Sequence, residues 1–74
     1  MWTRKKLMRE LPDITVYMEP DGLPCLGMVW EVTQTTATVH VLTGTHLYRA
    51  TVPALDVVRQ LNRSTSVTIT TWEV

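Results

Sequence analysis

The sequence predicts a mainly β fold, either a small barrel or a strongly bent five-stranded antiparallel sheet, with one short helix at about residues 53–62. Three observations support this prediction. The chain has 74 residues, which is the length of one domain. Hydrophobic residues alternate with a period of two between residues 26 and 52, as in strands. After Pro53 the spacing becomes helical, at Ala54, Val57, Val58 and Leu61.

Residues 1–12 are predicted to form a basic N-terminal arm or a short helix, ahead of a single small β-barrel domain over residues 13–74. Residues 1–9 hold four basic side chains and no acidic one, namely Arg4, Lys5, Lys6 and Arg9. A helix of this length is marginal on its own in water, so it must dock or stay mobile. Trp2 with Met1, Leu7 and Met8 is expected to form a separate apolar patch there.

The first strand is predicted at residues 13–19, with Ile14, Val16 and Met18 on one face. A turn follows at Pro20-Asp21-Gly22, where Pro presets its φ and Gly accepts a positive φ.

The second strand is predicted at residues 26–32. The alternation places Leu26, Met28, Trp30 and Val32 on the core face. Gly27 indicates a bulge or a close backbone approach. Val29 lies on the opposite face from Trp30, so both faces of this strand are expected to be covered.

The third and fourth strands are predicted at residues 36–42 and 46–52, joined by a three-residue hairpin loop with Gly44 in the left-handed region. In the helix, Pro53 fits the first position, Thr51 is the expected cap and Asp56 favours the first turn. A final strand is expected at residues 66–73. Trp72 lies out of phase there, as a lid over the barrel end or as an exposed contact.

Little in the sequence points to catalysis, so no enzyme, no catalytic residue, no cofactor and no metal site are predicted. Cys25 is the only cysteine, which excludes a disulfide within the chain. His40 and His46 flank the hairpin turn without further ligands at metal-binding spacing. No stretch reaches the length of a membrane span and no signal peptide is apparent, so a cytoplasmic protein is expected.

Two families resemble parts of this pattern. The stretch Ile14–Met18, Asp21-Gly22 and Leu26–Val29 is similar in rhythm to the first two strands of the Sm-like family, and Leu47–Ala50 resembles its fourth. That resemblance implies a five-stranded SH3-like barrel and nucleic-acid binding, although Thr33-Gln34 stands where a family polar pair is expected. Val52–Leu55 resembles the closing segment of the plasmid-borne trimethoprim-resistant dihydrofolate reductases. Their pore tetrapeptide has no match here, so that activity is rejected.

The function predicted from the sequence is therefore non-enzymatic contact with another protein, in a homodimer or higher oligomer. Compact accessory proteins of phages and plasmids that adapt or inhibit a larger partner provide the analogy. The expected partner-binding residues are Trp2, Arg4, Lys5, Lys6, Tyr48, Arg49 and Trp72. The alternative is an Sm-like or SH3-like RNA- or DNA-binding protein that uses the basic arm with Tyr48 and Arg49.

Overall fold

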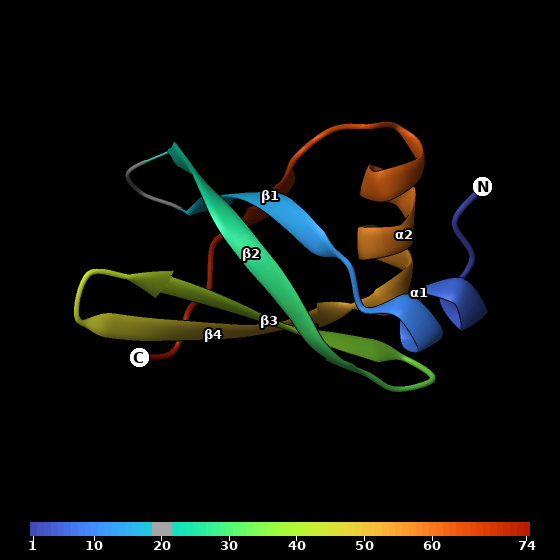
Figure 1. Cartoon of the computed structure of the whole chain (residues 1–74), viewed down its shortest axis with the longest axis horizontal. Helices are drawn as coiled ribbons and strands as arrows, with labels where there is room; N and C mark the ends of the chain where they lie inside the picture. Colours follow the sequence, from blue (N-terminus) through green and yellow to red (C-terminus); the bar gives the residue numbers. More distant parts are fainter. Residues whose placement is uncertain (19–21) are drawn as a thin grey trace.

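The computed structural model describes residues 1–18 and 22–74, and of Leu23 only the backbone. The predicted fold class is confirmed: five strands form a curled sheet, accompanied by two helices (Figure 1). In chain order the elements are α1 (Arg4–Glu10), β1 (Asp13–Met18), β2 (Leu23–Val32), β3 (Thr36–Thr43), β4 (His46–Pro53), α2 (Ala54–Asn62) and β5 (Val67–Ile69).

The strand order is β4-β3-β2-β1-β5, and the pairing of β5 differs from the antiparallel expectation. Each of β1, β2 and β3 pairs antiparallel with the next strand along the chain, whereas β5 runs parallel to β1. The sheet is mixed because α2 carries the chain from the end of β4 back across the sheet before β5 begins, as crossover connections do. Beyond β5 the chain returns to β4, where Arg49 and Glu73 exchange two backbone hydrogen bonds of 2.7 Å (Figure 1). The result is a half-barrel.

The core lies between the concave side of the sheet and the two helices, and it consists mainly of small aliphatic side chains. Its buried members are Leu7, Ile14, Val16, Val29, Ala37, Val39, Val41, Ala50, Ala54, Val57, Val58, Val67 and Ile69. The inward face predicted for the first strand, with Ile14, Val16 and Met18, is therefore confirmed. α2 contributes three of these residues from one face, as its helical spacing predicts.

The start of α2 differs from the prediction in two details. Pro53 stands at the N-cap with an extended ψ of 132°, one residue before the helix, and makes no side-chain cap. Thr51 lies within β4 and does not cap the helix. Strand pairing persists through Pro53, which lies opposite Thr36, and the Ala54 N–H donates to the Thr35 carbonyl at 3.0 Å. The helix can begin only where that pairing stops.

Before the bulge the orientation of β2 is opposite to the one predicted, whereas Val32, beyond it, packs against the core as predicted. Leu26 and Trp30 are 66% and 60% exposed, while Gly27 and Val29 face the core. A Cβ at Gly27 would collide with Val16, so the backbone of β2 lies directly against the side chains of β1. The close approach predicted for Gly27 is thus confirmed. Because glycine does not count as an apolar residue, the alternation in the sequence emphasised the outward-facing residues.

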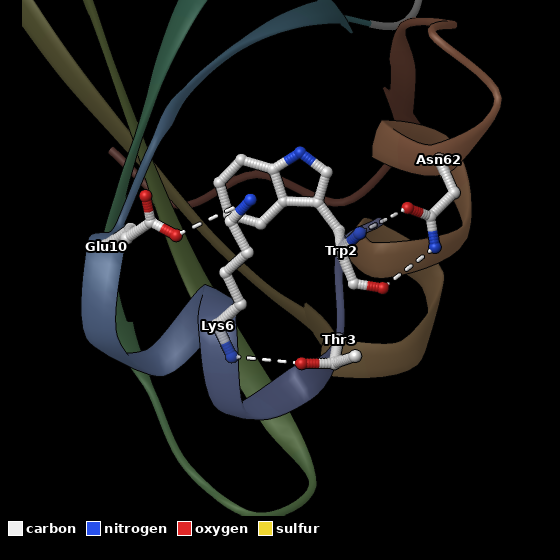
Figure 2. Close-up of polar contacts among 5 residues, drawn as sticks. All are labelled: Trp2, Thr3, Lys6, Glu10 and Asn62. Atoms are coloured by element: carbon white, nitrogen blue, oxygen red, sulfur yellow. Dashed lines mark hydrogen bonds and ion pairs between the residues drawn. The ribbon is translucent and has the colours of Figure 1, made fainter.

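The N-terminal segment is a helix packed against α2, and polar contacts add to the apolar packing that holds it to the body (Figure 2). The Thr3 hydroxyl accepts from the Lys6 N–H at 3.2 Å and caps α1. The Asn62 side chain accepts from the Trp2 N–H at 2.7 Å and donates to the Trp2 carbonyl at 3.0 Å. The separate apolar patch expected here is wrong, because Leu7 is fully buried and Trp2 packs against the core.

Two further boundaries differ from the prediction. Thr43 pairs with His46, so the hairpin loop has two residues, with Gly44 at a φ of 54° as expected. The last strand ends at Ile69 instead of Glu73. Gly22 has the expected positive φ, 68°, whereas the rest of the predicted turn, residues 19–21, lies outside the described residues.

Candidate functional site

The convex face of β2, β3 and β4 carries large apolar side chains in solvent. Leu26 and Trp30 on β2, Leu42 on β3 and Leu47 on β4 are all between 48% and 66% exposed, and together they are called the outer patch. Leu42 and Leu47 are direct cross-strand partners at the hairpin end. Scattered exposed leucines need no explanation, but several on one face of one sheet indicate a contact surface.

A β-bulge at Trp30 shapes the middle of this face. Val29 pairs with Val39 and Glu31 pairs with Thr38, so Trp30 is an extra residue without a partner on β3. In a regular strand, consecutive side chains point to opposite faces. The bulge instead turns both Trp30 and Glu31 outward, where both are exposed. An indole and a carboxylate from adjacent residues thus lie on one face.

The Trp30 ring is held by a neighbour on β3. It stacks on the His40 ring with centroids 4.9 Å apart and planes inclined by 15°. Offset stacking of this kind adds to the energy of area burial and limits ring rotation. Trp30 is therefore a positioned aromatic surface, although most of it remains in solvent.

A shallow depression of about 370 Å³ opens beside this stack. It is lined by Trp30, Glu31, Thr38, His40, Arg49, Thr51 and Glu73. Arg49 and Glu73 form an ion pair of 3.1 Å across it. Glu31 makes no ion pair with any residue that the structure describes. Two carboxylates and one guanidinium give the depression a net formal charge of −1 with His40 neutral.

Of the residues predicted from the sequence, Tyr48, Arg49 and Trp72 come together at the C-terminal closure. Tyr48 and Trp72 meet edge to face with centroids 6.5 Å apart, and both pack against the core. The Trp72 indole N–H donates to the Ile69 carbonyl at 3.0 Å. Of the two alternatives for Trp72, the structure supports the lid. Arg49 points outward into the depression.

The remaining predicted residues, Trp2, Arg4, Lys5 and Lys6, precede or lie in α1. Lys6 Nζ lies 4.6 Å from the Trp2 ring centroid and 3.8 Å from Glu10 Oε2 (Figure 2). Arg4 Nη1 donates to Met8 Sδ at 3.6 Å. The predicted set therefore divides into a group on the helical side and a group at the closure on β4. It does not form one surface.

The nucleophilic and metal-ligating residue types are dispersed. His40 lies on the outer face, His46 lies at the hairpin beside Thr45, and Cys25 is half-buried on β2. Within the part of the chain that the structure describes, no three His, Cys, Asp or Glu side chains gather closely enough to hold a metal ion. Neither α1 nor α2, the helices of the described residues, is long and apolar enough to cross a membrane.

The outer patch is what sequence reasoning missed. The sequence contained one signal for it. β2 has apolar residues at even as well as odd positions, with Leu26 and Trp30 on one side and Val29 on the other. Only the identity of the core face, which Gly27 decides, was hidden.

Comparison with known proteins adds no family. No protein-family model matches the chain, and neither a curated protein nor a solved structure shows significant similarity to it. The resemblance to the Sm-like family therefore rests on strand rhythm alone, and function has to be argued from this chain's own surface.

Proposed function

We propose that this protein is a non-enzymatic binding module that acts by protein–protein contact through the convex face of β2, β3 and β4. One observation carries the proposal: Trp30 is 60% exposed on that face, and the three leucines of the outer patch are exposed on it as well. Tryptophan dominates binding energy at interfaces because it buries a large area with few rotatable bonds.

The chemistry of the patch supports contact with a protein. Covering a large apolar side chain contributes roughly 1.5–3 kcal/mol relative to leaving it in water. Burial of Trp30, Leu26 and Leu42 by a partner would thus supply the central part of a specific interface. The charged and hydroxyl groups around Trp30, such as Glu31 and Arg49, would form a polar rim.

Nucleic-acid binding receives less support from the same geometry. The alternative needs the basic N-terminal segment and Tyr48 with Arg49 on one surface, but these lie on α1 and on β4. Arg49 is paired with Glu73, and Tyr48 is half-buried under Trp72. The convex face itself is acidic at the depression, which disfavours phosphate.

In this proposal the protein works in the cytoplasm as a small accessory subunit, of the kind that phages and plasmids encode, attached to a larger partner. Self-association through other surfaces would add stability to a chain without a disulfide, and we include it as part of the proposal.

Site-specific photocrosslinking in the native cell tests the proposed contact face. A photoreactive p-benzoylphenylalanine replaces Leu42 in one variant and Leu55 in another. Both leucines are exposed, at 66% and 59%, but Leu42 lies in the outer patch and Leu55 lies on α2. We expect a discrete protein adduct from position 42 and none from position 55.

Two results would contradict the proposal. One is the absence of a protein adduct from position 42 and also from position 26, the other exposed leucine of the patch. The second is an adduct formed solely with nucleic acid. In that second case an oligonucleotide titration should show affinity that falls steeply with salt, as counterion release requires.

A further inference from the structure

We propose that the depression beside Trp30 binds an arginine side chain presented by the partner protein. This inference rests on the proposed function, because it names the chemistry of the partner residue that the convex face would receive. Its physical basis is the juxtaposition, produced by the bulge in β2, of an exposed indole with a carboxylate that has no ionic partner among the described residues.

The bulge supplies both recognition elements from consecutive residues. Without it, Trp30 and Glu31 would point to opposite faces of β2. With it, both line the same depression. Bulges re-aim single side chains in this way and are common beside functional sites. The placement requires no mobile loop, since both residues lie within β2, which pairs with β3 on either side of the bulge at Val29 and Glu31.

The charges in the depression select a cation. Glu73 is already engaged by Arg49, but Glu31 has no ionic partner among the described residues. An incoming anion would meet two carboxylates and a guanidinium that is already neutralised. An incoming cation would meet the Glu31 carboxylate at the wall beside Trp30.

The aromatic wall favours arginine over lysine. A guanidinium is planar, so it can stack on an indole face and still donate two parallel hydrogen bonds to a carboxylate. Cation–π attraction is strongest over tryptophan. His40 covers one side of the Trp30 ring, yet the residue stays 60% exposed, which leaves ring surface for a ligand. The hydroxyls of Thr38 and Thr51 offer further acceptors in the same depression.

An NMR titration with a small probe tests this site without knowledge of the partner. The probe is Nα-acetyl-arginine amide, and its control is Nα-acetyl-citrulline amide, which has nearly the same shape without the charge. Sodium chloride keeps the ionic strength equal in the two series. The Trp30 indole resonance is assigned with Trp30→Phe. Because one cation–π contact and one exposed ion pair are individually weak, we expect a dissociation constant of about 10–100 mM for the arginine probe.

Variants locate the binding. Glu31→Gln removes the charge with almost no change in shape and should raise the dissociation constant of the arginine probe at least threefold. Glu10→Gln removes another exposed carboxylate, on α1 and outside the depression, and should leave the titration unchanged. A well-dispersed amide spectrum for each variant shows that it is folded.

Three results would overturn the inference: no saturable shift of the Trp30 indole, an equal shift with the citrulline probe, or an unchanged titration in Glu31→Gln. These failures are separate from a failure of the proposed function. A crosslink from position 42 without arginine binding contradicts only this inference, whereas arginine binding without any protein crosslink contradicts the contact proposal.

Discussion

Gly27→Ala is the substitution that most directly tests the packing of β2 on β1. A Cβ at this position would lie closer to Val16 Cγ2 than real Cβ atoms ever come to a neighbour, and 3.2 Å from Val39 Cγ1 and 3.3 Å from Ile14 Cγ1. The three contacted side chains are buried valines and an isoleucine, which are stiff at χ1 and cannot rotate away cheaply. The extra methyl group must therefore push strands apart.

The magnitude follows from two opposing terms. Overpacking a close-packed core costs about 1–3 kcal/mol. Replacing glycine by alanine within a strand returns about 0.5–1 kcal/mol of backbone entropy. The net expectation is a loss of about 1–2 kcal/mol in the free energy of unfolding, which for a domain of this size lowers Tm by about 5–15 °C.

Urea unfolding followed by circular dichroism measures this loss. Leu26→Ala, one position away on the exposed face of β2, is the matched control and should change stability by less than about 0.5 kcal/mol. The double variant Gly27→Ala with Val16→Ala should be more stable than the two separate losses predict, because the removed methyl groups make room for the new one. A Gly27→Ala protein as stable as the parent would refute the close approach of the two strands.

Four further outcomes follow from the structure. Leu7→Ala empties a fully buried site and should cost about 2–5 kcal/mol by urea unfolding, which ties α1 to the core. Asn62→Ala removes both hydrogen bonds to Trp2 and should speed amide hydrogen exchange in α1, with a loss of about 1 kcal/mol. Trp72→Ala should cost about 2–3 kcal/mol, below the full value for a buried tryptophan because it is half-buried. Trp30→Ala should change stability by less than about 0.5 kcal/mol yet abolish the crosslink from position 42; a large loss of stability would return Trp30 to the core.

The elements with one apolar face could be predicted from the sequence because a single period describes them. β1 and β3 alternate strictly, with Ile14 and Val16 or Val39 and Val41 inward, and α2 repeats at helical spacing. In each case most apolar residues lie on the core face, although Leu42 on β3 and Leu55 on α2 are exposed. The pattern and the packing then carry the same information.

β2 could not be oriented from its pattern because its core face includes a glycine. The period of two runs through Leu26, Met28 and Trp30, and these are the outward residues. The start of the strand was also hidden, because Pro24 reads as a break. Over residues 23–27 β2 pairs with β1 while the pairing with β3 begins only at Met28, so this stretch resembles an edge strand, where proline is tolerated.

The C-terminal closure depends on contacts that no local pattern contains. The threonine-rich stretch from residue 66 reads as one long strand, but pairing with β1 lasts only for Val67–Ile69. The chain then turns so that Trp72 covers Tyr48 and Glu73 reaches Arg49. Whether Trp72 was lid or contact thus depended on a bend that sequence periodicity does not specify.

The size of the core explains why the outer patch cannot be a misplaced core face. A one-residue slip of β2 would turn Trp30 inward and Val29 outward. The core side of β2 is lined by small aliphatic side chains such as Val16, Val39 and Ile14, which leave no room even for a Cβ at Gly27. An indole does not fit there. Polar side chains are compatible with the convex face, because Thr38 lies on that face too. Large apolar side chains there exceed what folding requires, and this excess is the physical argument for the proposed contact with another protein.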